Sequence, residues 1–335
     1  MATMETSQKI LDYIAKNNQA SGKELVDYLG DITPRAVRKQ LKNLLENGKL
    51  RKIGRPPKVF YLLSLVAADS LKIKEGVAVK IVGEKDRRII DERYLFITPD
   101  GEMRYGWNGF KEWCEKTKQN PVKTGSEYVA TLNKYDAFTK GGLIDGMGKM
   151  KNTFHKEVFL DRLFYFDFYS IERFGKTKIG QILLHSKNSQ DKKLIKILVD
   201  EIRPKAMSLI EKYSVDGALF IPPTIKREVQ FMKELEKNLK LSIKTLSVAK
   251  VKTPVTVAQK TLSKLDDRIE NARKTIVVED SGIYENIILI DDAVGSGSTL
   301  NETAAQIKKR GLCRGKIIGL AIVGSFKGFD VISEV

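Results

Sequence analysis

Two adjacent carboxylates, Asp291 and Asp292, follow four aliphatic residues and precede a loop rich in glycine and serine. The apolar run predicts a buried parallel strand over Ile287–Ile290, and the helical spacing of apolar residues further on predicts a helix over Thr299–Lys309. The acids are therefore expected at the carboxyl end of a strand, which is where open α/β sheets bind their ligands.

The loop after the acids has the composition of a phosphate site. It offers backbone N–H groups without bulky side chains, together with three hydroxyl groups, at the amino terminus of the expected helix, where the helix dipole favours an anion. A carboxylate pair beside a phosphate must face something else, such as ribose hydroxyls or a magnesium ion. Ribose 5-phosphate offers both groups, a phosphate and ribose hydroxyls. The loop consists of Gly295, Ser296, Gly297, Ser298 and Thr299.

The segment 287–299 resembles the motif with which type I phosphoribosyltransferases bind 5-phosphoribosyl 1-diphosphate (PRPP). The resemblance implies that Asp291 and Asp292 are the catalytic acids, that they hold the ribose hydroxyls directly or through Mg²⁺ bound mostly by PRPP, and that the loop binds the 5-phosphate. An ordinary crossover turn has no need of two adjacent acids, and a Walker loop is excluded because the sequence has no GxxxxGK[ST]. One departure concerns Gly295, which provides no side chain where some purine-salvage enzymes of this family carry an aspartate base.

Two other segments extend the resemblance to about residues 163–325, and with it the expected type I phosphoribosyltransferase fold with a parallel sheet. The residues after an expected strand at Asp216–Ile221 resemble the diphosphate loop of the family. The long polar connection before residue 287 resembles a Q-x-x-L and R-x-x-N stretch of ComF-type proteins and is expected to be a lid, the alternative being an exposed charged helix. The diphosphate residues are Pro223, Thr224, Lys226 and Arg227, and the lid residues are Gln259, Lys260, Arg268 and Asn271.

Residues 1–65 resemble a winged helix-turn-helix domain. Thr33 and Pro34 predict the start of a third helix that runs to Glu46, and a two-stranded hairpin follows at Leu50–Ile53 and Val59–Leu63. The third helix has one basic and one apolar face. The resemblance implies binding to double-stranded DNA, although such domains also serve in dimerisation or RNA binding. The DNA contacts are expected from Arg35, Arg38, Lys39 and Lys42 on the helix and from Arg55 and Lys58 at the wing tip.

Residues 66–160 carry the least information. Short strands are expected at Gly76–Val82 and Tyr94–Thr98, helices at Gly109–Lys118 and Ser126–Lys134, and a glycine-broken loop at 140–150. We interpret the region as a small α+β connecting domain of unknown role. Trp107 and Trp113 are expected in its core. The predicted domains are thus 1–65, 66–160 and 161–335.

Composition favours a polyanionic partner. The 335 residues carry a formal net charge of +17, and this charge is spread along the chain. Two cysteines and two histidines provide neither a disulfide framework nor a zinc finger. No apolar stretch is long enough to span a membrane, so a cytoplasmic protein is expected.

Two functions follow from these modules. In the first, PRPP or a nucleotide is the effector of a DNA-binding regulator, as in the purine-operon repressors, and the protein is a homodimer. In the second, the protein is an active phosphoribosyltransferase, ComF-like or a nucleotide-directed defence effector, which the winged helix recruits.

Overall fold

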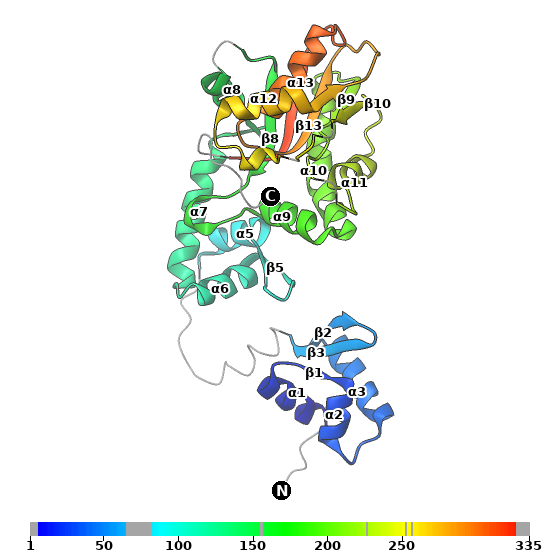
Figure 1. Cartoon of the computed structure of the whole chain (residues 1–335). Coiled ribbons are helices and arrows are strands. Elements are labelled where there is room, and N and C mark those ends of the chain that lie inside the picture. Colours follow the sequence, from blue (N-terminus) through cyan, green and yellow to red (C-terminus); the bar gives the residue numbers. More distant parts are fainter. Residues whose placement is uncertain are drawn as a thin grey trace. The chain divides into compact units, whose positions relative to one another are not determined.

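The structure is a computed structural model that describes residues 6–64, 82–154, 157–225, 227–251, 253–255 and 257–325. The chain divides into two compact units, Met1–Lys80 and Ile81–Val335 (Figure 1). None of the helices in these described ranges combines the length and apolar character needed to cross a bilayer.

The first unit contains three helices and a three-stranded antiparallel sheet with the order β1-β3-β2. The side chain of Thr33 caps the third helix by accepting a hydrogen bond of 3.3 Å from the Ala36 N–H, and Pro34 occupies the first helical position, as predicted. The elements are α1 (Thr6–Asn17), β1 (Ala20–Ser21), α2 (Gly22–Leu29), α3 (Pro34–Glu46), β2 (Leu50–Arg55) and β3 (Lys58–Leu63).

The basic side chains of this unit lie on its surface. Val37, Leu41 and Leu44 of α3 are buried in the core, and the opposite face of the helix is exposed. The predicted division of α3 into an apolar and a basic face is therefore present. The exposed cations are Arg35, Arg38, Lys39 and Lys42 on α3, with Arg55 and Lys58 at the ends of the turn between β2 and β3.

The second unit is an α/β structure around a seven-stranded, mostly parallel sheet with the order β10-β9-β13-β14-β8-β7-β6. Five strands are parallel, as the alternation of strands and helices predicts: β8 (Arg162–Phe168), β9 (Gly217–Phe220), β10 (Lys244–Thr245), β13 (Ile287–Val294) and β14 (Ile317–Gly324). Two short strands, β6 (Thr139–Lys140) and β7 (Leu143–Asp145), extend it in antiparallel fashion.

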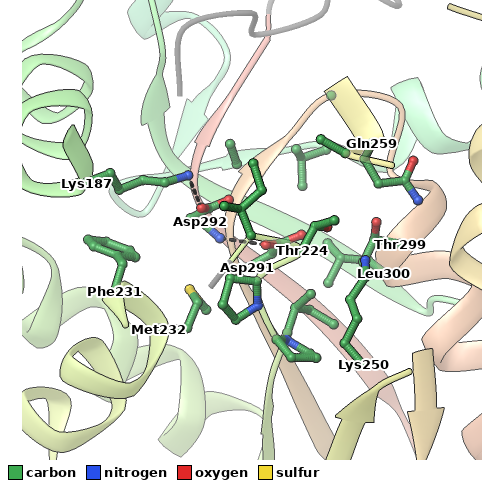
Figure 2. Close-up of a pocket in the computed structure, with 18 of the residues that line it drawn as sticks. Lys187, Thr224, Phe231, Met232, Lys250, Gln259, Asp291, Asp292, Thr299 and Leu300 are labelled. Carbon is green, nitrogen blue, oxygen red and sulfur yellow. Dashed lines mark hydrogen bonds and ion pairs between the residues drawn. The ribbon is translucent and has the colours of Figure 1, made fainter. Parts of the chain in front are cut away.

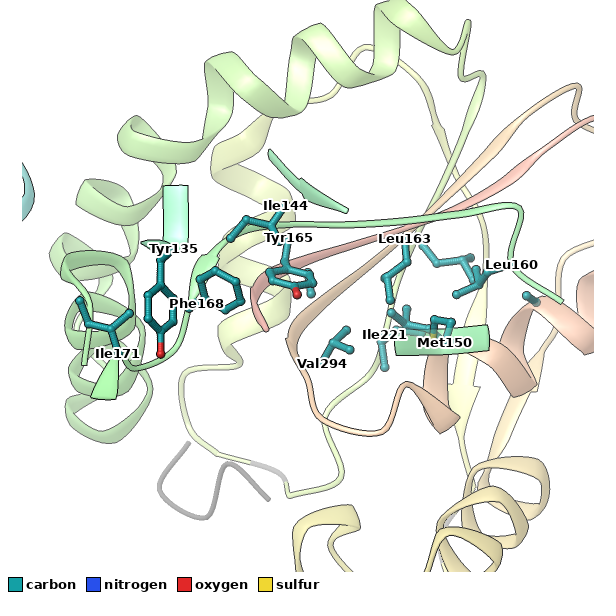
Figure 3. Packing of buried hydrophobic residues seen from close by; sticks show 14 of the residues in the cluster. Tyr135, Ile144, Met150, Leu160, Leu163, Tyr165, Phe168, Ile171, Ile221 and Val294 are labelled. Carbon is teal, nitrogen blue, oxygen red and sulfur yellow. The ribbon is translucent and has the colours of Figure 1, made fainter. Parts of the chain in front are cut away.

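Helices cover both faces of this sheet. Along β13, Ile287 and Leu289 belong to one hydrophobic core and Ile288 and Ile290 to the other, because successive side chains of a strand point to opposite faces. The first core contains side chains of α8 (Met147–Phe154) and α13 (Ser298–Lys309), with α12 (Leu265–Thr275) packed on α13 (Figure 3). The second core contains α9 (Lys178–Ser189), α10 (Lys192–Lys212) and α11 (Phe231–Leu239).

The expected connecting domain, from residue 82 where the structure describes it, belongs to the second unit. Trp107 and Trp113 pack on its core, as predicted, and ring centroids of Trp107 and Phe110 lie 5.9 Å apart. Its first elements are α5 (Glu84–Arg93), β4 (Leu95–Ile97), β5 (Met103–Tyr105), α6 (Gly106–Lys116) and α7 (Pro121–Asp136). The expected strand at Gly76–Val82 lies almost wholly outside the described residues.

The prediction of a loop at 140–150 was wrong. Glycines at 141 and 142 turn the chain between β6 and β7, and α8 follows immediately. Because β7 pairs with β8, the chain expected to be a connecting domain completes the sheet of the second unit. Glycine spacing indicated the turn correctly, but it did not reveal the strand pairing on either side of it.

The strand order places a switch point between β9 and β13. These strands are neighbours, but the helices that follow them lie on opposite faces, α11 in one core and α13 in the other. A crevice outside the carboxyl ends of the strands forms at such a point in open α/β sheets. The long connection before β13 lies beside it and contains β11 (Val248–Lys250), the short helix η2 (Gln259–Thr261), α12 and β12 (Ile276–Val278). The chain leaves the sheet after β10 and then pairs with β12 as β11.

Asn301 fixes the first turn of α13 to the preceding chain. Its side-chain oxygen accepts a hydrogen bond of 2.8 Å from the Phe159 N–H, and its side-chain nitrogen donates one of 2.8 Å to the Glu157 carbonyl. The residue is 1% exposed, so water cannot readily replace either bond.

We therefore predict that Asn301→Ala destabilises the protein by about 2 kcal/mol, because two backbone groups lose their hydrogen bonds to a buried side chain. The measurement is the free energy of unfolding from denaturant titration. Asn238→Ala is the matched control, since Asn238 on α11 is partly exposed and its side chain donates one bond, to the Glu234 carbonyl within its own helix. Equal losses for the two variants would contradict the assigned role of Asn301.

Candidate functional site

A pocket opens at the switch point, at the carboxyl ends of β9 and β13 (Figure 2). The segments that follow these two strands form its walls, and the lid segment and the end of α9 contribute further side chains. The pocket brings together most of the residues predicted from the sequence: Asp291, Asp292, Gly295, Ser296, Gly297, Ser298, Thr299, Pro223, Thr224, Arg227, Gln259 and Arg268.

Three predicted residues are not placed in the pocket. Lys226 lies outside the described residues, and so does the side chain of Lys260. Asn271 lies on α12 but does not line the pocket, although its buried side-chain oxygen has no hydrogen-bond partner among the described residues. The predicted lid therefore contributes Gln259 and Arg268 to the site, and the role of the other two remains a prediction.

The acid pair lies within β13 and not beyond its end. The strand was expected to stop at Ile290, but it continues to Val294, paired with β14 alone after β9 has ended. The sequence pattern could not predict this extension, because polar residues at the end of an apolar run normally indicate a turn. Alternation along the strand directs Asp291 and Asp292 to opposite faces of the sheet.

Each acid has a lysine from a different element nearby. Lys187, in the last turn of α9, forms an ion pair with Asp292, and both side chains are largely buried. Lys250 of β11 lies near Asp291 in the pocket, and the negative charge of Asp291 favours the protonated form of the lysine. Figure 2 shows Lys187 directed at Asp292 from across the pocket.

Burial and the neighbouring Asp292 raise the pKa of Asp291 well above its usual range. The Asp292 N–H, which donates a hydrogen bond of 2.8 Å to Asp291 Oδ1, opposes this effect only in part. Burial also lowers the pKa of Lys250, and the charge of Asp291 counteracts it. The ionisation of each of these groups thus depends on the charge of its neighbours, which is typical of binding and catalytic sites.

The loop after β13 leaves a helix amino terminus open. Gly297 occupies the N-cap position of α13 in the left-handed region, with φ 84°, and provides no side chain to cap the helix. The amides of Thr299 and Leu300 belong to the first turn, which has no acceptors within the helix. The hydroxyls of Ser296 and Ser298 lie 2.7 Å apart and are buried beside them. This geometry suits a bound anion.

Packing from α8 holds this loop in place. A Cβ atom at Gly297 would lie 2.4 Å from Met150 Sδ, closer than any real contact. Both the positive φ and this close approach require glycine at 297. The residue expected to let a phosphate approach the backbone is therefore also needed for packing on its outer side.

The opposite wall of the pocket is tied to α9. The Arg227 guanidinium donates to the Lys187 carbonyl, and the Val229 N–H donates to the Gln190 side chain at 2.9 Å. Phe231 and Met232, at the start of α11, line the pocket close to Asp292 (Figure 2). These two apolar residues form a surface against which a planar ring would pack.

Among the pocket residues that were not predicted from the sequence are two cations and two large apolar side chains: Lys187, Lys250, Phe231 and Met232. Lys187 lies in the last turn of α9, and Phe231 and Met232 begin α11. Nothing in their local sequence pattern distinguishes these three residues from ordinary helix residues. The described charged residues of the pocket are four cations (Lys187, Arg227, Lys250 and Arg268) and two acids, which is a net charge of +2. The balance favours an anionic ligand.

The acid pair alone does not form a metal cage. Within the described residues, no group of three or more His, Cys, Asp or Glu side chains is placed to hold a metal ion. Two carboxylates suit Mg²⁺ only when a ligand's phosphates complete the coordination, which is how this ion is commonly held.

Comparisons with known proteins add little. No protein-family model matches the chain, and no curated protein is significantly similar to it. A crystal structure of a hypoxanthine phosphoribosyltransferase from Staphylococcus aureus is similar with 14% sequence identity, over 39% of this chain and 74% of that chain, at a TM-score of 0.22. A similarity with so low a TM-score carries no argument.

We predict that Asp291→Asn stabilises the ligand-free protein by about 1–2 kcal/mol at neutral pH. The raised pKa means that the folded state resists ionisation of Asp291, so stability falls as pH rises from the unfolded pKa through the folded one, and asparagine removes this cost. The measurement is the free energy of unfolding at several pH values. Asp200→Asn, an exposed position on α10, is the control with an expected change below about 0.5 kcal/mol. A loss of stability in Asp291→Asn would contradict the prediction.

Proposed function

We propose that this protein is a DNA-binding regulator whose second unit binds PRPP or a nucleotide as its effector. The observation that carries the proposal is the meeting of the acid pair and the uncapped glycine-serine loop in one cationic pocket. A ligand with vicinal hydroxyls and a phosphate a few bonds away satisfies both groups at once. The motif at 287–299, which resembles the PRPP-binding motif of type I phosphoribosyltransferases, supports the same ligand.

In the proposed complex the 5-phosphate lies at residues 295–299 and the ribose hydroxyls lie at Asp291 and Asp292. The diphosphate of PRPP would be bound by the 223–227 segment, where Arg227 is available, with Mg²⁺ held between the phosphates and the carboxylates. A nucleotide would place its base against Phe231 and Met232. Either ligand replaces the lysine that pairs with Asp292 in the free protein.

Three features favour a regulator over an enzyme. Gly295 gives the loop no side chain to accept or donate a proton, and Asp292 is already compensated by Lys187. The first unit also offers what a DNA reader needs, namely a capped helix with an exposed basic face followed by a hairpin with cations at its tip. We take this unit to be a winged helix and expect a homodimer, because such readers usually bind two half-sites.

The retention of both acids favours the alternative, an active phosphoribosyltransferase recruited by its first unit. In that case the protein's contribution would be to position PRPP and to stabilise charge as diphosphate leaves. The two functions differ in one measurable property, the release of diphosphate in the presence of an acceptor base.

The test combines binding and turnover on the full chain. We expect PRPP with Mg²⁺ to change the affinity for a duplex selected from a random-sequence pool, with no diphosphate released in the presence of a panel of purine and pyrimidine bases. Fluorescence anisotropy measures the first quantity and a coupled diphosphate assay the second. Diphosphate release that disappears in Asp292→Ala would instead establish the enzyme.

The basic face of α3 is tested separately. We predict that Arg35→Ala with Lys39→Ala weakens duplex binding at least about tenfold and lowers the salt slope by about 2, since two phosphate contacts are lost. Calorimetric PRPP binding should be unchanged. The control is Lys9→Ala with Lys16→Ala, which removes two exposed charges from α1 of the same unit. Equal weakening by both pairs would mean that net charge, and not this helix face, accounts for DNA binding.

A further inference from the structure

Arg268 is a buried cation without an anionic partner. Only 5% of the residue is exposed, and its Nε donates a hydrogen bond of 2.7 Å to the Leu262 carbonyl. Its Nη2 has no hydrogen-bond partner among the described residues, although it is completely enclosed. The side chain nevertheless lines the pocket. The Nη2 group of the guanidinium is thus shielded from water and has no hydrogen-bond acceptor in the described part of the chain, at the wall of the pocket.

The surrounding structure holds Arg268 in this position. Its backbone carbonyl accepts a hydrogen bond of 3.0 Å from the Gln259 side chain, which ties α12 to the short helix before it. An arginine remains charged under all ordinary conditions, so it cannot escape the cost of burial by losing its proton. Of the two acids in the pocket, Asp292 is paired with Lys187. Burial lowers the pKa of Arg268, and no described acid opposes this effect. The missing partner is therefore expected from outside the chain.

Gly295 leaves space beside the guanidinium on the side of the loop. A Cβ atom built on Gly295 would have Arg268 Nη1 as its one neighbour within 4 Å, at 3.7 Å, which is ordinary van der Waals contact. The φ of Gly295 is not in the left-handed region, so the backbone does not require glycine here. An alanine would fit. A longer acidic side chain would extend toward the guanidinium and pair with it.

We propose that Arg268 is the charged ligand of the phosphate bound by the 295–299 loop, and that Gly295 is needed to keep its guanidinium free. This inference rests on the proposed function, since it assigns a partner to the phosphate of that ligand. It also explains the glycine at position 295, because an acidic side chain there would neutralise the Arg268 guanidinium that binds the phosphate. The site is accordingly selective for phosphorylated pentoses, whether or not they carry a diphosphate or a base.

The test is isothermal titration calorimetry of the full chain with PRPP plus Mg²⁺, with ribose 5-phosphate and with ribose. In Arg268→Gln we expect the affinity for PRPP and for ribose 5-phosphate to fall by a similar factor of about 10 to 100, the effect of a lost charge-assisted hydrogen bond. A loss confined to PRPP would overturn the proposal, since Arg268 would then bind the diphosphate. Unchanged binding of both ligands would overturn it as well.

Substitutions at Gly295 separate charge from shape. Gly295→Ala is expected to bind both ligands within about twofold of the unaltered protein, whereas Gly295→Asp, which keeps Arg268, should lose about as much as Arg268→Gln and melt at a higher temperature because of its internal ion pair. Equal losses for alanine and aspartate, or normal binding by Gly295→Asp, would refute the inference. Circular dichroism and thermal melting verify that each variant is folded. If the unaltered protein binds neither PRPP nor ribose 5-phosphate, the proposed function itself is wrong, and not only the role assigned to Arg268.

Discussion

The placement of two adjacent carboxylates on a central strand is the constraint to which the rest of the site responds. Strand geometry sends Asp291 and Asp292 to opposite faces, and each acid meets a lysine from the element on its own side, Lys250 from β11 and Lys187 from α9. Burying a charge is costly unless another charge compensates it. In the free protein these lysines offset part of the cost of ionising the acids, and a ligand must offer at least as much as the lysines provide.

Topology explains why so many segments reach one pocket. The connections from β9 and β13 leave toward opposite faces, so a crevice opens between their carboxyl ends. The loop after β13 is supported from behind by Met150 of α8, a helix that belongs to the segment preceding β8. Asn301 adds a second support by binding the chain at 157–159. The 295–299 loop thus depends on residues that precede it by more than a hundred positions.

Sequence patterns located the centre of the site better than its rim. The acid pair and the glycine-serine loop were predicted because their residue types are unusual after an apolar strand, whereas Arg227 and Arg268 were predicted from a resemblance to family segments; all of them line the pocket. Lys187, Lys250, Phe231 and Met232 were missed because they are ordinary in their local context. Their involvement follows from where α9, β11 and α11 end in space. The same limit applies to residues 139–154, where a glycine-rich segment expected to be a loop forms a hairpin of the main sheet and a helix.

What the sequence determined by itself was local: the apolar run of β13, the capped start of α3 with its two faces, and a loop that has glycine where a phosphate would approach. These features are encoded within a few consecutive residues, through alternation, helical spacing and the small size of glycine. Only the tertiary structure decided that β13 runs on past its acids, that Lys187 pairs with Asp292, and that Arg268 is enclosed beside Gly295 without a partner. Those outcomes depend on which distant elements pack together, because burial and charge compensation are properties of the assembled fold and not of any one segment.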